Sequence, residues 1–328
     1  MKTGAFIAGL GAALPSRRLT NQDLEKLVDT TDEWITQRTG IKERRIVGPG
    51  ESNSKLAVRA ARLALEQAGV SPEELDLIIV GTLTPDYLMP SVAVLVQKEL
   101  GATRAGAFDL SATCSGFIYG LAVADQFVRV DRKRKILVIG SEVLSSKVNW
   151  KDRTTCVLFG DGAGAAVVTG ATSEERGLLS AHLHADGSLW HLLTLKGCGS
   201  LYPPCGDELP LEEYYIRMQG REVFKNAVRA MEAVALEALE ENGLSPADID
   251  LVVPHQANIR IIEYLRERLG LPEEKVFINL HKYGNTSAAS IPIALTEAVQ
   301  EGRLKPGDLV LMVAFGGGFT WASALMRW

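Results

Sequence analysis

Apolar residues are spaced along the chain in two ways, which together predict alternating helices and buried strands. In residues 57–68 and 227–238 they fall on one face of a helix with 3.6 residues per turn. Continuous runs of Val, Ile, Leu and Met occur at residues 77–80, 136–139, 251–253 and 309–313. Because such runs between helices are typical of strands buried on both faces, the pattern predicts an α/β protein.

The same order of elements occurs twice. Gly69-Val70-Ser71-Pro72 follows the first helical segment, Gly243-Leu244-Ser245-Pro246 follows the second, and an apolar strand comes next in both places. Glycine suits the C-terminal end of a helix, and a proline soon after it cannot continue the helix. The repeat predicts two related α/β halves, residues 1–175 and 176–328, whose sheets pack with helices between and outside them.

Composition and charge are those of an ordinary soluble globular protein, and they exclude several classes of function. The 328 residues are 46% hydrophobic and carry a formal net charge of −5, whereas a nucleic-acid-binding domain would be basic. No apolar run is long enough for a membrane helix. The four cysteines form no CxxC motif, which favours a reducing compartment and predicts a cytoplasmic protein. Whether Cys198 and Cys205 form a pair stays open.

Cys114 is the strongest candidate for a reactive side chain. It follows the short run at residues 107–110 and precedes a helical pattern that includes Phe117, so we expect it at a helix N-terminus. The positive end of the helix dipole favours a thiolate, and the small residues around Cys114 would let a substrate carbonyl approach the backbone. A buried structural cysteine is the alternative for this position.

Two further positions extend the hypothesis of a nucleophilic site. His255 follows the strand at residues 251–253, and ligands of open α/β sheets bind beyond the carboxyl ends of strands. In the repeat, the segment of Asn285 nearly corresponds to that of Cys114, so pseudo-symmetry predicts that both reach one central cleft. His182 and His184 alternate along another expected strand, but without a further ligand motif they do not predict a metal site.

Five segments, in order along the whole chain, resemble the β-ketoacyl-acyl carrier protein synthase III family of the thiolase-like superfamily. They are residues 32–41 (DEWITQRTGI), 108–117 (FDLSATCSGF), 254–258 (PHQAN), 283–287 (YGNTS) and 316–321 (GGGFTW). The family contains the initiating condensing enzymes of type II fatty-acid synthesis. For the two α/β halves the resemblance implies a thiolase-like fold with a layered αβαβα architecture.

The family's triad of Cys, His and Asn falls on Cys114, His255 and Asn285. By this resemblance, Cys114 would take the acyl group of an acyl-CoA primer. His255 and Asn285 would donate hydrogen bonds to malonyl-acyl carrier protein and stabilise the enolate left by loss of CO2. The backbone N–H groups of Cys114 and Gly317 would bind the oxyanion formed when the enolate attacks the acyl group. The resemblance implies no metal and no redox cofactor.

The resemblance also implies where coenzyme A and the acyl chain bind. Trp34 and Arg153 would enclose the adenine, because flat aromatic and guanidinium groups suit that contact. The other residues implied in coenzyme A binding are Arg38, for a phosphate, and Gly220, Phe224 and Asn258, for the pantetheine tunnel. Met89 falls where the family often has an aromatic residue at the acyl pocket, which leaves the size of the primer open.

Cations near the expected tunnel mouth predict a docking surface for the acidic carrier protein. These cations are Lys225, Arg260, Arg266 and Arg268. Arg260 and Arg268 are eight residues apart and can share one helix face, although a solvated helix face is the alternative for Arg266 and Arg268. The family further implies a homodimer in which the loop of Met89 lies close to the partner's acyl pocket.

Three alternative functions would use the same residues differently. A cysteine hydrolase would pass the acyl group from Cys114 to water, but the sequence lacks the local signatures of papain-like enzymes. A silent binding subunit would not be acylated at all. A polyketide-type condensing enzyme also uses Cys, His and Asn, usually in a longer chain.

A nucleotide-binding loop is not predicted, because the glycine cluster at residues 160–164 lacks the GxGxxG spacing.

Overall fold

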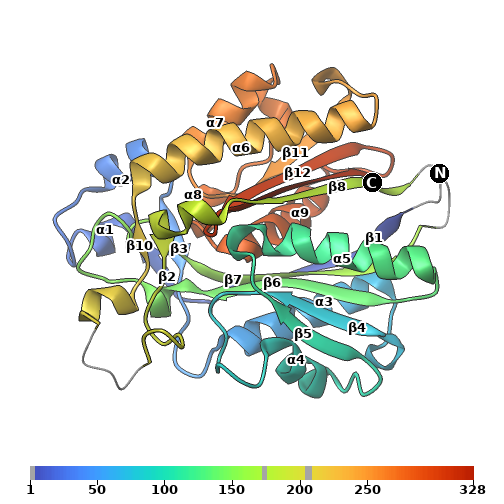
Figure 1. Ribbon diagram of the computed structural model, residues 1–328, viewed down its shortest axis with the longest axis horizontal. Coiled ribbons are helices and arrows are strands. Elements are labelled where there is room, and N and C mark those ends of the chain that lie inside the picture. Colours follow the sequence, from blue (N-terminus) through green and yellow to red (C-terminus); the bar gives the residue numbers. More distant parts are fainter. Residues whose placement is uncertain (1–3, 172–175, 204–208) are drawn as a thin grey trace.

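The computed structural model describes residues 4–171, 176–203 and 209–328, in which two sheets alternate with layers of helices (Figure 1). The strand order of the first sheet is β1 (Ala5–Ala13), β7 (Asp161–Gly170), β6 (Ile136–Val143), β4 (Leu77–Gly81) and β5 (Gly106–Leu110). The strand order of the second sheet is β11 (Leu251–Pro254), β12 (Leu309–Gly316), β13 (Thr320–Arg327) and β8 (Gly177–Ala185). The predicted α/β fold is confirmed.

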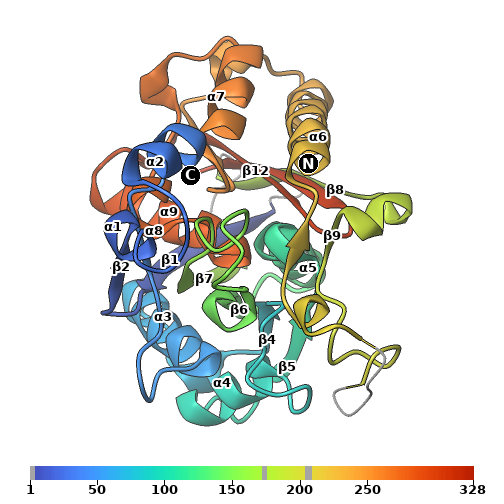
Figure 2. The ribbon, with the colours of Figure 1, turned by 90° about the vertical axis from the view of Figure 1, so that its left-hand side faces the viewer.

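Helices lie in three layers around the two sheets, as Figures 1 and 2 show. The inner layer is α5 (Gly116–Val130) and α9 (Ser290–Gln300); the outer layers are α3 (Asn53–Ala68) with α4 (Val92–Leu100), and α6 (Gly220–Glu241) with α7 (Ile259–Arg268). One apolar cluster joins side chains of α5 and α9 to both sheets, and Phe117 and Leu295 within it are completely buried. Because each such side chain stabilises the fold by about 1.5–3 kcal/mol, the inner helices hold the two sheets together.

The two halves repeat at a nearly constant spacing of 174 residues. The αL glycine that ends α3 is Gly69, with a φ of 62°, and the glycine after α6 is Gly243, with a φ of 64°. The 3-10 helices Pro72–Glu74 and Pro246–Asp248 follow, each with a capping box. The repeat expected from the sequence is therefore present in the structure. The predicted division between residues 175 and 176 falls between β7 and β8, and it stays a prediction.

The repeat also shows how closely Cys114 and Asn285 correspond. Thr113 and Ser287, which are 174 residues apart, have positive φ values of 46° and 49° and begin the short 3-10 helices that precede α5 and α9. Cys114 lies one residue after the first of these points, whereas Asn285 lies two residues before the second. The two residues are thus offset by three positions, but both lie at the N-terminal ends of the inner helices.

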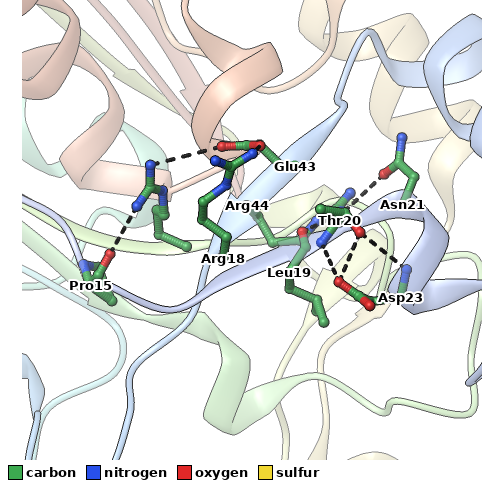
Figure 3. Close-up of polar contacts among 9 residues, drawn as sticks. Pro15, Arg18, Leu19, Thr20, Asn21, Asp23, Glu43 and Arg44 are labelled. Atoms are coloured by element: carbon green, nitrogen blue, oxygen red, sulfur yellow. Dashed lines mark hydrogen bonds and ion pairs between the residues drawn. The ribbon is translucent and has the colours of Figure 1, made fainter.

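An insertion between β1 and α3 contains the strands β2 (Arg18–Thr20) and β3 (Glu43–Arg45) and the helices α1 (Asn21–Leu24) and α2 (Asp32–Thr39). Arg44 of β3 is completely buried, and its guanidinium donates hydrogen bonds to the Leu19 carbonyl and the Asn21 side chain (Figure 3). It also donates to the carbonyl of Val157, at 2.8 Å. Burial lowers the pKa of Arg44 to about 10, so the group stays charged at neutral pH. Arg44 therefore ties the insertion to the segment before β7.

The smaller elements include α8 (Leu280–Tyr283), β9 (Leu193–Thr194) and β10 (Arg217–Met218). Further 3-10 helices are Leu144–Lys147, Gly187–Leu192, Leu211–Tyr214 and Glu273–Lys275. None of the helices in the described ranges has the length and hydrophobicity that a membrane crossing needs. Cys205 lies outside the described residues, so whether it pairs with the exposed Cys198 stays open.

Candidate active site

Cys114, His255 and Asn285 line one cavity between the two halves. Cys114 lies in the 3-10 helix that precedes α5, His255 directly follows β11, and Asn285 lies just before the 3-10 helix that leads into α9. All three side chains are buried. The structure thus brings together the three residues expected to react, from both halves of the repeat.

The Cys114 thiol is not poised as a thiolate in this structure, which corrects the expectation from the helix dipole. The residue lies at the N-terminus of α5 as expected. Burial nevertheless raises the pKa of the thiol to about 12, and the negative charge of Glu142 contributes in the same direction. Removal of the thiol proton therefore needs an acceptor within the site.

His255 is held as a neutral hydrogen-bond donor. Its backbone N–H donates to the Val313 carbonyl at 2.8 Å, which continues the pairing of β11 with β12. Burial lowers the pKa of the imidazole to about 3. Nδ1 lies 2.7 Å from the Ser290 hydroxyl oxygen, which itself accepts the Gln256 N–H at 3.4 Å. Because Ser290 can then donate to Nδ1, the proton of the ring is assigned to Nε2.

Hydrogen bonds hold both the backbone and the side chain of Asn285. Its backbone N–H donates to the Leu158 carbonyl at 2.8 Å, and its carbonyl accepts from Gly160 at 3.0 Å. The side-chain Oδ1 accepts the Ser287 N–H at 2.8 Å. Nδ2 has no hydrogen-bond acceptor among the described residues, so it is the group of Asn285 that can donate to a ligand in the cavity.

A second cavity borders Cys114 on its other side, and Gly317 and Ser287 line it. Thr113 Oγ1 donates to the Gly317 carbonyl at 2.9 Å, which joins the turn of Cys114 to the end of β12. A Cβ atom at Gly316 would lie 2.7 Å from the Cys114 nitrogen and 2.2 Å from Thr113 Oγ1. Gly316 is therefore needed for this close approach, a function that the sequence did not reveal.

The residues expected to bind coenzyme A form a continuous path from the first cavity to the surface. Gly220, Phe224 and Asn258 line that cavity together with Cys114. The Asn258 side chain donates to the Arg38 carbonyl at 3.1 Å. The guanidinium carbons of Arg153 and Arg38 lie 5.3 Å and 5.9 Å from the ring centroid of Trp34. The six residues are therefore neighbours, although their contacts with a ligand stay a prediction.

The expected docking cations fall into two kinds. Arg266 pairs with Glu263 at 2.6 Å, and Arg268 pairs with Glu232 at 2.7 Å. The guanidinium of Arg260 instead lies 5.8 Å from the ring centroid of Phe224, at the side of the first cavity. Within the described ranges, the exposed Lys225 and Arg260 form no ion pair. They are the cations left to meet an acidic partner.

Met89 lies at the surface, away from both cavities beside Cys114. Its side chain is 84% exposed, and it lines neither cavity beside Cys114. The reason is local, because Tyr87, Leu88 and Pro90 are exposed as well and the whole loop faces solvent. A place beside a partner's acyl pocket stays a prediction.

His182 has more neighbours than the sequence suggested. Its ring lies 3.5 Å from Glu237 and 3.9 Å from Glu241, both on α6, and the three groups offer ligand atoms within 4.8 Å of one another. The Ser180 hydroxyl already lies 3.0 Å from Nε2, and Glu237 also contacts His184 at 2.7 Å. None of these residues lines the cavities beside Cys114. The cluster lies apart from the candidate active site.

Comparison with known proteins identifies the family. Residues 108–187 match the family model for 3-oxoacyl-[acyl-carrier-protein] synthase III, and residues 239–328 match the model for its C-terminal part. The β-ketoacyl-[acyl-carrier-protein] synthase III of Caldanaerobacter subterraneus subsp. tengcongensis is 55% identical over 327 residues, which cover 100% of this chain and 98% of that relative.

Solved structures agree over the full length. The 3-oxoacyl-[acyl-carrier-protein] synthase III of Aquifex aeolicus VF5 superposes with a TM-score of 0.92 at 55% identity, covering 99% of this chain and 100% of the other. The priming β-ketosynthase of the R1128 polyketide biosynthetic pathway superposes with a TM-score of 0.92 at 38% identity, covering 99% and 97%. The chain therefore belongs to the β-ketoacyl-[acyl-carrier-protein] synthase III family of condensing acyltransferases.

Proposed function

We propose that the cavity around Cys114 joins the acyl group of an acyl-CoA to malonyl-acyl carrier protein with loss of CO2. The product is a 3-oxoacyl-acyl carrier protein, and the reaction begins fatty-acid synthesis. One observation carries the assignment of residues: a single buried cavity presents a thiol, a neutral imidazole and a fixed side-chain amide. Together these supply the nucleophile and the two donors that the reaction needs.

In the first half-reaction, Cys114 Sγ attacks the thioester carbonyl of the acyl-CoA. The bond between the carbonyl carbon and the sulfur of coenzyme A breaks, coenzyme A leaves as a thiolate that takes up a proton, and the acyl group stays on Cys114. The backbone N–H groups of Cys114 and Gly317 are the proposed donors to the oxyanion. The second cavity, on the Gly317 side of Cys114, would hold the acyl chain.

In the second half-reaction, malonyl-acyl carrier protein enters through the first cavity. His255 Nε2 and Asn285 Nδ2 donate to the thioester carbonyl oxygen of the malonyl group, so that the carbon–carbon bond to the carboxylate breaks and an enolate forms. Its carbon attacks the acyl carbon, and Cys114 leaves as a thiolate. A pKa of about 3 keeps His255 neutral throughout, so it stabilises the enolate as a donor and does not transfer a proton.

The partners follow from the same site. Trp34, Arg38 and Arg153 are proposed to hold the nucleotide end of coenzyme A, with no metal or redox cofactor. Lys225 and Arg260 are proposed to steer the acidic carrier protein to the tunnel.

A second copy of the chain is proposed to cover the edge strand β5, where Phe108 is 38% exposed. An unpaired strand edge with exposed apolar side chains is a surface on which another chain can pair. The exposed loop of Met89 precedes α4 and would lie at this contact. A cytoplasmic location is proposed for the dimer.

Mass spectrometry of the intact protein tests this function. The native chain should gain one acyl group from acetyl-CoA or a branched acyl-CoA, keep it in buffer, and lose it when malonyl-acyl carrier protein is added. The Cys114→Ala variant should gain none. His255→Ala should be acylated but should condense about 100- to 1000-fold more slowly, because it lacks one donor to the enolate.

Two results would contradict the proposal. Stoichiometric acylation of Cys114→Ala would exclude the nucleophile. Loss of the adduct to water without a malonyl donor would favour a cysteine hydrolase.

A further inference from the structure

Glu142 is a buried carboxyl group beside the nucleophile that the reaction described above does not use. It lies on β6 and is completely buried. Its carboxylate accepts hydrogen bonds from Thr84 Oγ1 at 2.6 Å, and from the Leu83 N–H and Thr82 Oγ1 at 3.2 Å each. No cation pairs with Glu142 among the described residues, and burial raises the pKa of the carboxyl group to about 7. Such a group can change its protonation state at neutral pH.

Ser287 connects Glu142 to Cys114. Its hydroxyl is buried and makes no hydrogen bond of regular geometry with any described residue. The 3-10 helix that Ser287 begins packs against both β6, which carries Glu142, and the 3-10 helix of Cys114, and Ser287 lines the second cavity together with Cys114. In agreement with this position, Ser287 lowers the pKa of both Cys114 and Glu142 relative to the effect of burial alone. A buried hydroxyl without a fixed partner can rotate, accept a proton from one neighbour and donate its own to the other.

Charge decides where the thiol proton can go. If the proton left for solvent while Glu142 was ionised, the site would hold two buried negative charges side by side, which is strongly unfavourable. If the proton moves to Glu142, the site holds one negative charge before and after the transfer. His255 is not an alternative acceptor, because a pKa of about 3 makes it too weak a base at neutral pH.

We propose that Glu142 takes the Cys114 thiol proton through the Ser287 hydroxyl during acyl transfer and returns it after condensation. The inference rests on the proposed function, since it concerns the proton of the same thiol. In acyl transfer the S–H bond breaks and Glu142 becomes a neutral acid. The sulfur forms its bond to the acyl carbon as the bond from that carbon to the sulfur of coenzyme A breaks, and the released coenzyme A thiolate takes its proton from water. In condensation the sulfur leaves with the electron pair, and the proton on Glu142 restores the thiol.

Other titratable groups around Glu142 do not offer the same route. Asp161, on the neighbouring strand β7, directs its carboxylate to the Ser145 hydroxyl and N–H and to the Val47 N–H. Asp125 of α5 accepts from the Ala5 N–H, and Glu297 of α9 contacts Tyr283. The helix α3 also packs against β6, and its Arg59 pairs with Glu51 at 3.1 Å. The charge of Glu142 is the one that acts on the Cys114 thiol and raises its pKa.

The test is the rate of acyl transfer as a function of pH, measured by rapid quenching and intact mass with acetyl-CoA. Because only the ionised carboxylate accepts a proton, the native rate should rise with pH, bend near pH 7 and level off above it. Glu142→Gln keeps the size of the side chain but cannot take the proton. It should be about 100-fold slower at pH 8, a typical loss for a proton acceptor, and should lack the bend. At pH 5 the two proteins should differ little.

Three further variants separate proton transfer from a loss of structure. Glu142→Asp should keep the bend, because a carboxyl group remains. Asp161→Asn, which changes the other buried carboxyl of this region, should also keep it. Ser287→Ala should slow acyl transfer at least 10-fold while Glu142 is intact.

The outcomes are distinct. If native protein gains no acyl group, the proposed function fails. If native protein is acylated and Glu142→Gln shows the same rate and the same bend, the proposed function stands and this inference is overturned. A slow Glu142→Gln variant that keeps the bend also overturns it, because the change then acts on structure alone.

Discussion

Replacing Gly316 by alanine should displace the nucleophile without replacing any reacting side chain. The added Cβ would lie 2.2 Å from Thr113 Oγ1, 2.7 Å from the Cys114 nitrogen and 3.0 Å from the Cys114 Cβ, whereas ordinary contact begins at 3.4 Å. The turn that carries Cys114 must therefore retreat by roughly 1 Å. It cannot do so freely, because Thr113 Oγ1 is bonded to the Gly317 carbonyl.

The size of the effect follows from this displacement. Misplacing a reacting group by about 1 Å can slow a reaction about 100-fold, and overpacking of a core costs about 1–3 kcal/mol. We therefore expect Gly316→Ala to acylate Cys114 about 100-fold more slowly than the native protein and to unfold at a lower temperature. Rapid-quench mass spectrometry with acetyl-CoA and calorimetric thermal unfolding measure the two effects.

Gly187→Ala is the matched control. No atom lies within 4 Å of the Cβ that it would add, and the φ of Gly187 is not positive, so rate and unfolding temperature should stay native. A Gly316→Ala protein with a native acylation rate would refute the close approach between β12 and the turn of Cys114.

Two other changes test features of the structure outside the reacting groups. Arg44→Ala leaves buried acceptors without a donor, so it should lower the free energy of unfolding by about 3 kcal/mol in urea denaturation. Arg18→Ala breaks only an exposed ion pair with Glu43 and should change the free energy of unfolding by less than about 1 kcal/mol. Arg260→Glu should raise the KM for malonyl-acyl carrier protein, as added salt does, while the rate of acyl transfer from acetyl-CoA stays native. Arg268→Glu changes a residue already paired with Glu232 and should raise that KM less. Equal loss of both half-reactions in Arg260→Glu would place that residue in the coenzyme A site or the core.

The periodic patterns and the repeat were sufficient to predict two α/β halves and the approach of Cys114 and Asn285. The thiolase-like fold and the place of His255 beside these two residues were implied by the resemblance to the synthase III family. Buried strands, glycine caps and the repeat are local signals, and the repeat alone indicates that two helix starts converge. The environment of the Cys114 thiol, in contrast, is formed by residues that are far from it in the sequence. The helix dipole favours a thiolate at Cys114, whereas burial in the cavity and a carboxyl group from β6 raise the pKa of the thiol, and neither cause can be read from neighbouring residues.

Glu142 did leave a signal in the sequence. It is a charged residue within the otherwise uncharged segment 136–146, where a buried strand is expected, and a buried charge needs a reason. Gly316 left no such signal in the sequence. It is the first of three consecutive glycines at residues 316–318, and only its packing against Cys114 in the structure distinguishes it from the other two. The pairing of Arg268 was equally hidden, since Glu232 is far from it in the sequence. The pairing of Arg266 was visible, because Glu263 lies three residues before it on the same helix.

Arg44 joins the insertion that carries the proposed coenzyme A site to the backbone of Asn285, the proposed enolate donor. Its guanidinium links the insertion that carries Trp34 to Val157, and the next residues, Leu158 and Gly160, hold the backbone of Asn285. Opening the insertion would leave a buried charge without partners and release the segment that orients Asn285. We therefore expect amide hydrogen exchange of the Asn285 and Gly160 N–H groups to report the same opening free energy as exchange of the Asn21 N–H in the insertion.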